Sequence, residues 1–132
     1  MQIHHVGYLV KSIEKARKKF EALGFEPEGI ATFDEYRGID ILFMVNDGYR
    51  IELVEPKTEN SVVIDTYKKF GNSPYHICYC CENIEETMES LREDGYLPLG
   101  EPASAVAIDG KRVCFLFNRQ IGIIELVEQR RI

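Results

Sequence analysis

The sequence predicts an α+β fold made of two tandem βαβββ units. Three observations lead to this prediction. The chain aligns with itself when His76 is placed over His5, a shift of 71 residues. Each copy opens with a short apolar run, typical of a buried strand, and continues with apolar residues at helical spacing. Each copy then ends in two apolar segments joined by a turn, which is typical of a hairpin.

The repeat is clearest around two histidines. HVGYLVKSIEKARKKFEALGF, which starts at His5, aligns with HICYCCENIEETMESLREDGY, which starts at His76. Later in each copy, ILFMVNDGYRIELVE at residues 41–55 aligns with VCFLFNRQIGIIELVE at residues 113–128, after small adjustments of register. The four letters ELVE are identical in both copies. Each unit therefore has a histidine near its start and a glutamate near its end.

The length and composition fit one globular domain. The 132 residues are 45% hydrophobic, which allows a sizeable core. A single βαβββ unit could not cover its own apolar face, so both units are expected to share one domain. We predict this domain over residues 1–132, organised as repeat one at 1–56, a connecting segment at 57–73 with a short helix near 62–69, and repeat two at 74–132.

The strands are predicted from apolar and β-branched runs. The opening strands cover roughly residues 3–10 and 75–81, where Val, Ile, Tyr and Cys are frequent. In repeat one, residues 39–45 and 49–54 are joined at Asn46-Asp47-Gly48, a strong hairpin signal. In repeat two, residues 112–118 and 122–127 are joined around Arg119-Gln120.

The two helices are predicted from apolar residues at helical spacing behind a capping residue. Ser12 caps the first helix and Asn83 the second, where Glu86 occupies the capping-box position. A glycine, Gly24 or Gly95, ends each helix. The apolar stripes comprise Ile13, Ala16, Phe20 and Leu23 in the first helix, and Ile84, Thr87, Met88 and Leu91 in the second.

Charge and composition exclude several classes of protein. A net charge of -6 argues against a nucleic-acid partner, which would require a basic face. No apolar run approaches the ~18 residues of a membrane span, and the N-terminus lacks the pattern of a signal peptide, so we expect a cytoplasmic protein without a membrane partner. Three of the four cysteines are crowded into one apolar run, which predicts buried free thiols; the four are Cys78, Cys80, Cys81 and Cys114.

Two histidines and two glutamates are the candidate metal ligands. Alternation along the strands puts His5 on one face with Gly7, and His76 on one face with Cys78. Glu52 and Glu125 lie inside the apolar contexts RIELV and IIELV, where a carboxylate requires a partner. Taken alone, each histidine fits a core residue whose hydrogen bonds are satisfied. Each glutamate, taken alone, fits a side chain that faces water at the end of a strand. Their coincidence in register across a repeat favours a divalent metal site, whereas His4, with Tyr75 in the matching position, is expected to be a neighbour.

At these residues the sequence resembles the vicinal oxygen chelate (VOC) superfamily, in its glyoxalase I and methylmalonyl-CoA epimerase branch. The resemblance covers HHVGYLV, GYRIELVEP, SPYHICY and GKRVCFLF leading to IGIIELVE. It implies a cupped mixed sheet, the VOC or glyoxalase fold, and makes His5, Glu52, His76 and Glu125 the metal ligands. Bleomycin-binding members resemble this fold without the ligands, and fosfomycin-resistance and extradiol dioxygenase members use three, so they fit less well.

The resemblance implies proton-transfer chemistry next to a carbonyl. Four protein ligands leave two positions open on a metal that prefers six, so adjacent substrate oxygens can bind and an enediolate can be stabilised. By resemblance Glu125 is the first choice as catalytic base and Glu52 the second. Imidazole and carboxylate ligands suit Ni²⁺ or Co²⁺, with Zn²⁺ as a further option, better than Ca²⁺ or Mg²⁺.

The preferred function is a glyoxalase I-type lyase that isomerises the hemithioacetal of a 2-oxoaldehyde and a thiol. The alternative is a methylmalonyl-CoA epimerase-like enzyme, which needs a second base. Epimerase-like sequences place that base two residues before a glycine; Tyr36 stands there in DEYRGIDI, and Glu35 would face away if it lay on a strand.

A second alternative is a binding module without catalysis.

In AIDGKRV, Lys111 is assigned to the anionic tail of a thiol-conjugated or thioester substrate, with Glu35 as a second substrate-contacting residue. An exposed lysine at a turn would look the same. The oligomeric state is left open, with a homodimer among the options.

Overall fold

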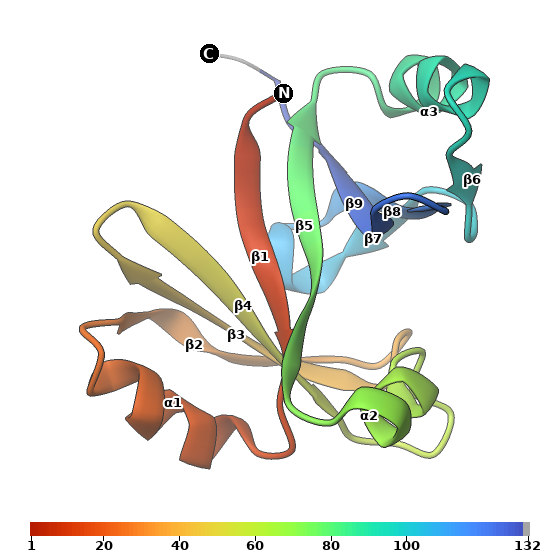
Figure 1. The fold of residues 1–132 in the computed structure, drawn as a ribbon. Coiled ribbons are helices and arrows are strands. Elements are labelled where there is room, and N and C mark those ends of the chain that lie inside the picture. Colours follow the sequence, from red (N-terminus) through yellow and green to blue (C-terminus); the bar gives the residue numbers. More distant parts are fainter. Residues whose placement is uncertain (131–132) are drawn as a thin grey trace. The chain divides into compact units, whose positions relative to one another are not determined.

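The computed structural model describes residues 1–130, which form two compact units. One unit is His5–Tyr75, and the other runs from His76 onward and includes Met1–His4. Figure 1 labels the α-helices and strands along the chain. The elements are β1 (Ile3–Leu9), α1 (Ile13–Glu21), β2 (Glu26–Asp34), β3 (Ile39–Asn46), β4 (Tyr49–Pro56), α2 (Ile64–Phe70), β5 (Ser73–Cys81), α3 (Ile84–Glu93), β6 (Leu97–Pro98), β7 (Ala103–Ala105), the 3₁₀ turn η1 (Val106–Ile108), β8 (Lys111–Asn118) and β9 (Gly122–Glu128).

In the first unit the strands follow the order β2-β3-β4-β1. β1 pairs with β4 in parallel, and the other two pairings are antiparallel. The predicted hairpin joins β3 to β4 through Asp47 and Gly48, whose positive φ values of 50° and 82° are those of a type I′ turn. One face of the sheet packs under α1, through a core that includes Leu42, Met44 and Leu53.

The second unit repeats this arrangement. Its strands follow the order β5-β9-β8-β6, and β7 also pairs with β8. β5 pairs with β9 in parallel, as β1 pairs with β4 in the first unit. Its core joins α3 to one face of the sheet through Ile84, Cys114, Leu116, Ile124 and Leu126. The predicted α+β class and tandem βαβββ repeat are therefore confirmed.

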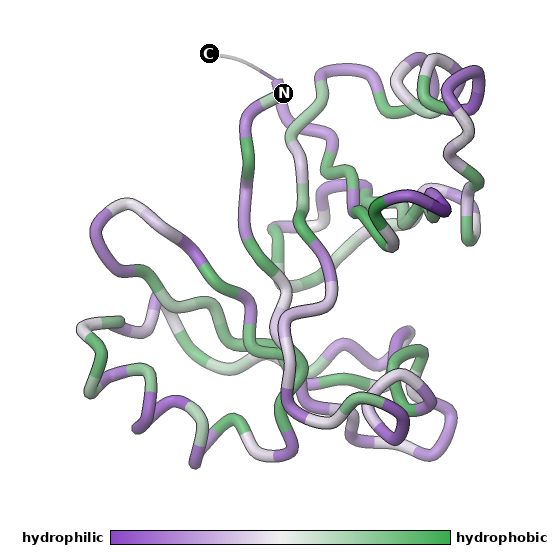
Figure 2. Tube along the Cα trace, viewed as in Figure 1, coloured by the Kyte–Doolittle hydropathy of each residue, from purple (hydrophilic) through white to green (hydrophobic). Residues whose placement is uncertain are grey.

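The caps of both repeat helices agree with the prediction. Ser12 Oγ accepts a hydrogen bond from the backbone N–H of Lys15 at 3.2 Å, and Asn83 Oδ1 accepts one from the N–H of Glu86 at 3.0 Å. Such caps satisfy backbone donors that have no partner inside the helix. In Figure 2, hydrophilic and hydrophobic stretches alternate along α1, as expected for a helix with one buried side.

The end of the first helix differs from the prediction. α1 ends at Glu21, and Leu23, which was predicted to complete the apolar stripe, is 69% exposed. The backbone N–H of Phe25 returns to Phe20 O at 3.1 Å, and the two rings meet edge to face at 5.5 Å between centroids. Phe25 thus covers the last turn of α1, and no place in the core is left for Leu23.

The segment between the repeats contains the predicted short helix. It is α2, Ile64–Phe70, close to the predicted residues 62–69. None of the helices in the described part of the chain is long and apolar enough to cross a membrane. The four cysteines are free thiols, but Cys80 is only half-buried, so the prediction of four buried thiols was wrong at that position. Its strand ends beside a surface hollow described below.

Candidate functional site

The first repeat brings its histidine and glutamate together. His5 lies on β1 and Glu52 on the neighbouring β4, where Glu52 is in register with Gly7. Because His5 and Gly7 share a face of β1, the two side chains meet on the side of the sheet away from α1. His5 Nε2 lies 3.4 Å from Glu52 Oε1, and the two residues are only 1% and 5% exposed.

The second repeat forms the same pair in the same register. His76 lies on β5 and Glu125 on β9, where Glu125 is in register with Cys78, two residues after the histidine. His76 Nε2 lies 3.0 Å from Glu125 Oε1, and both residues are 4% exposed. Each half of the chain therefore buries one imidazole against one carboxylate.

A phenylalanine completes each pair, and the sequence reading did not single it out. The ring of Phe43 meets the His5 ring edge to face at 5.3 Å, and Phe115 meets His76 in the same way at 5.1 Å. Phe43 is also in register with Glu52, and Phe115 with Glu125. The signal was present in the repeat, because both phenylalanines are the third residue of the aligned segments ILFMVN and VCFLFN.

The spacing inside each pair fits a divalent metal ion. Two ligand atoms that each lie ~2.1 Å from one ion are separated by about 3.0 Å at a right angle and about 3.4 Å at a tetrahedral angle. The His76–Glu125 and His5–Glu52 separations are 3.0 Å and 3.4 Å. Imidazole nitrogen with carboxylate oxygen is a donor set that suits transition metals.

At the start of α3, Arg112 forms a network of ion pairs with Glu85 and Glu128. Its guanidinium donates to Glu85 at 2.7 Å and 2.9 Å, and to Glu128 at distances that include 3.0 Å. The hydrogen bonds to Glu85 and then to Glu128 raise the pKa of Arg112, and the bonds from Arg112 lower the pKa of Glu85. The charge of Arg112 is therefore balanced within the protein.

Lys111, the predicted substrate-binding residue, lines a hollow of about 520 Å³. The hollow also contains Gly110 and Arg130. Lys111 Nζ donates to the side-chain oxygen of Gln129 at a long 3.4 Å, so it is held only weakly by its partner. Glu82, Arg112 and Glu128 also line the hollow. Because Arg112 pairs with Glu85 and Glu128, Lys111 and Arg130 are the cations that face a ligand there, beside the carboxylate of Glu82.

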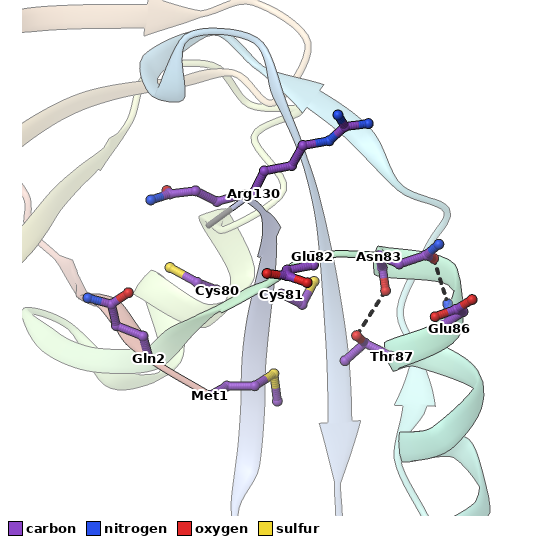
Figure 3. A pocket seen from close by; sticks show the side chains of 10 residues that line it. Met1, Gln2, Cys80, Cys81, Glu82, Asn83, Glu86, Thr87 and Arg130 are labelled. Carbon is purple, nitrogen blue, oxygen red and sulfur yellow. Dashed lines mark hydrogen bonds between the residues drawn. The ribbon is translucent and has the colours of Figure 1, made fainter. Parts of the chain in front are cut away.

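A larger hollow of about 770 Å³ lies at the start of α3 (Figure 3). Its lining includes Cys80, Cys81 and Thr87, and none of the predicted metal ligands. Figure 3 shows the Thr87 hydroxyl donating to the backbone carbonyl of Asn83, at 2.9 Å. Burial raises the pKa of the Cys81 thiol, which keeps it protonated and a poor nucleophile.

Glu35 is exposed and lies in a turn, not on a strand. β2 ends at Asp34 and β3 starts at Ile39, its register partner, so the turn contains residues 35–38. Strand alternation therefore does not direct the Glu35 side chain away from the site. Asp34, which is 3% exposed, holds the turn by accepting hydrogen bonds from the backbone and side chain of Arg37 at 3.0 Å and 2.8 Å.

With this geometry in view, the family can be assigned. Residues 4–115 match the Glyoxalase/Bleomycin resistance protein/Dioxygenase superfamily. The chain belongs to this superfamily. The chain is 27% identical over 132 residues to the uncharacterized protein YqjC of Bacillus subtilis, a match that covers 98% of this chain and 93% of YqjC.

Two further proteins to which the chain is similar are epimerases. The chain is 29% identical to the ethylmalonyl-CoA/methylmalonyl-CoA epimerase of Cereibacter sphaeroides, over 95% of this chain and 96% of that protein. Its fold is similar to that of a Streptomyces coelicolor methylmalonyl-CoA epimerase in complex with 2-nitronate-propionyl-CoA, with a TM-score of 0.86, 23% identity, and coverage of 100% of this chain and 96% of that chain. These similarities support the epimerase alternative better than the preferred glyoxalase I function.

Proposed function

We propose that this protein is a divalent-metal-dependent epimerase of CoA thioesters, of the methylmalonyl-CoA type. The observation that carries the proposal is the similarity to the Cereibacter sphaeroides epimerase over 95% of this chain, joined to the duplicated His–Glu pair. The proton next to a thioester carbonyl is weakly acidic, so an enzyme can remove it and return it to the other side.

The metal would be held by both pairs together, through His5, Glu52, His76 and Glu125. This set supplies neutral imidazoles and carboxylates, and the spacing inside each pair fits one ion. When bound, a divalent ion polarises the carbonyl oxygen and so acidifies the neighbouring C–H. We propose Ni²⁺ or Co²⁺ as the native metal, with Zn²⁺ as the third option.

The chain's own residues would move the proton. Inversion needs one base on each side of the carbon, and we assign Glu125 to one side. Phe115 is the cross-strand neighbour of Glu125, and His76 Nε2 lies 3.0 Å from its carboxylate. Glu35 is the first choice for the other side, because its turn is held in place by Asp34. Glu52 is the second choice.

The cationic residues beside β8 would bind the anionic tail of the substrate. Lys111 and Arg130 face the hollow of about 520 Å³, whereas Arg112 is already paired with two carboxylates. Lys111 is therefore assigned to a phosphate of the CoA tail. A cytoplasmic location, a single domain over residues 1–132 and a homodimer remain predictions that accompany this function.

The decisive experiment follows hydrogen exchange at the α-carbon. The protein is stripped of metal, reloaded separately with Ni²⁺, Co²⁺, Zn²⁺ or Mg²⁺, and mixed with methylmalonyl-CoA in D₂O, while mass spectrometry records deuterium uptake. We expect uptake with a transition metal and a loss of at least 100-fold in Glu125→Gln, since a general base contributes roughly 10²–10⁴-fold.

The same preparations are offered the hemithioacetal of methylglyoxal and glutathione. Isomerisation of this compound without α-exchange of methylmalonyl-CoA would overturn the proposal in favour of the glyoxalase I-type lyase. Binding of methylmalonyl-CoA without any turnover would instead favour a binding module.

A further inference from the structure

The edge of the second sheet carries exposed apolar side chains on the face that bears the His76–Glu125 pair. β6 is the edge strand of this sheet (Figure 1). Leu97 on β6 is in register with Phe117 on β8, and Phe117 with Ile123 on β9. Residues in register share a face, and Ile123 lies two residues from Glu125 on the same strand. All of them are therefore on the face away from α3.

These side chains are open to solvent. Leu97 is 60% exposed, Leu99 58% and Phe117 37%, while Ile123 is half-buried. Leu99 belongs to the same edge, because its backbone N–H donates to Phe115 O at 2.8 Å. We call Leu97, Leu99, Phe117 and Ile123 the apolar strip. It begins beside Phe115, the residue that contacts His76.

In the first repeat, charged residues occupy three of the equivalent positions. Pairing in the first sheet places Glu26, Glu28 and Arg50 at the positions of Leu97, Leu99 and Ile123. Arg50 Nε donates to Glu28 Oε1 at 2.8 Å, which closes that edge with an ion pair. These three equivalent positions are thus charged in the first repeat and apolar in the second. The backbone alone therefore does not require apolar residues there.

The geometry points to a specificity role: we propose that the apolar strip binds the alkyl part of the substrate's acyl group, and that the protein prefers acyl thioesters with chains longer than methyl. This inference rests on the proposed function. Two residues along a strand span about 7 Å, so Ile123 and Phe117 come within reach of an alkyl chain of about five carbons beyond the Glu125 carboxylate. A polar pantetheine arm would find no hydrogen-bonding side chain among these four residues.

The test measures how affinity depends on chain length, which needs no turnover. Calorimetry gives the Kd of butyryl-, hexanoyl- and octanoyl-CoA for the metal-loaded protein and for the double variant Leu97→Ser/Leu99→Ser. Burial of one methylene strengthens binding about three- to fourfold, so we expect the parent to gain about tenfold for each two carbons. The double variant keeps Ile123 and Phe117, so it should lose mainly the gain from hexanoyl- to octanoyl-CoA, while the affinity for free CoA stays unchanged.

A matched control is Ile121→Ser. Ile121 is 61% exposed but lies in the turn between β8 and β9, outside the apolar strip. This variant should keep the parent's dependence on chain length. Circular dichroism checks that all variants are folded, which is expected because the replaced leucines are already exposed.

Two outcomes would overturn the proposal. One is an equal dependence on chain length in the parent and the double variant. The other is a change from dimer to monomer in the double variant with its dependence on chain length retained, which would show that a second copy of the chain covers the strip. A failure of the epimerase assignment would be seen separately, as an absence of α-carbon exchange while these affinities are still measurable.

Discussion

The Glu128 carboxylate accepts a hydrogen bond from the backbone N–H of Ile84, the first residue of α3, at 3.0 Å. The first repeat has the same contact, in which Glu55 Oε1 accepts from the N–H of Ile13 at 2.7 Å. In both repeats the last glutamate of ELVE therefore binds the start of the helix, while the first glutamate binds the histidine. A carboxylate in this place satisfies a free donor and interacts favourably with the helix dipole.

Replacing the capping glutamate should destabilise the first repeat without affecting its metal ligands. Glu55→Ala removes an acceptor from the N-terminus of α1, and loss of such a cap costs about 1 kcal/mol. Urea denaturation measures the change in the free energy of unfolding. The exposed Glu59→Ala is the matched control, and its free energy of unfolding should stay within about 0.5 kcal/mol of the parent value. An equal loss in both variants would contradict the capping role.

The contribution of Glu128 should depend on pH. The hydrogen bond from Ile84, and then the one from Arg112, lower the pKa of Glu128 in the folded protein. The folded state thus binds the proton more weakly than the unfolded state, whose pKa is about 4.3. The stabilisation is complete above that value and is lost as the pH falls through the folded pKa.

We expect the difference in unfolding free energy between the parent and Glu128→Ala to shrink between about pH 6 and about pH 3. Urea denaturation at several pH values gives this difference directly. A difference that grew on acidification would show that the assigned direction of the pKa shift is wrong.

Removing one imidazole should weaken metal binding and lower thermal stability together. At a metal concentration ~100 times the Kd, binding to the folded state contributes about 2.7 kcal/mol, which His76→Ala should largely abolish. Elemental analysis and calorimetric melting with and without added metal are the measurements. His4→Ala is the control and should retain both properties. Full metal content and an unchanged Tm in His76→Ala would refute the ligand assignment.

Glu35→Gln tests the second base. If Glu35 serves one side of the carbon and Glu125 the other, the variant should still exchange the α-proton of one enantiomer of methylmalonyl-CoA but lose at least 100-fold in conversion between enantiomers. Chiral chromatography and deuterium uptake separate the two activities. Equal retention of both would assign the second base to Glu52, the glutamate paired with His5.

Lys111→Ala tests the contact with the anionic tail. A contact that is equal in the ground and transition states should raise KM, by roughly tenfold for a charge-assisted hydrogen bond, with little change in kcat. The neighbouring Arg112 is an unsuitable control because it joins α3 to β9 through Glu85 and Glu128. Arg119→Ala, in the turn after β8, serves instead and should leave KM unchanged.

Much of the fold could be predicted because the sequence pattern of one unit is repeated in the second half of the chain. The shift that aligns His5 with His76 also aligns the opening strands and the caps, and small adjustments of register then align both ELVE segments. Periodicity could not predict the capping role of Glu55 and Glu128, because that contact depends on which strand lies beside the start of each helix. The bounds of β2 were also missing from the prediction, since Pro27 and Gly29 interrupt any alternation and its register with β3 shifts after Glu28.

The candidate site was predictable in its residues and less so in its surroundings. His5 and His76 stood out because each opens a repeat, and their glutamate partners followed from apolar context. The contacts of Phe43 and Phe115 with the histidines could not be predicted, because aromatic residues in an apolar strand are ordinary core residues. Glu35 was assigned a strand geometry, but four residues of turn separate β2 from β3.

The spacing within ELVE has an evolutionary consequence. Its two glutamates are three positions apart on one strand, so one carboxylate faces the histidine while the other faces the helix. A codon inserted or deleted between them would turn both carboxylates toward the same layer, and either the helix or the imidazole would lose its partner. Homologous genes should therefore tolerate exchange of the central Leu-Val for other apolar pairs while conserving the length of this segment in both halves.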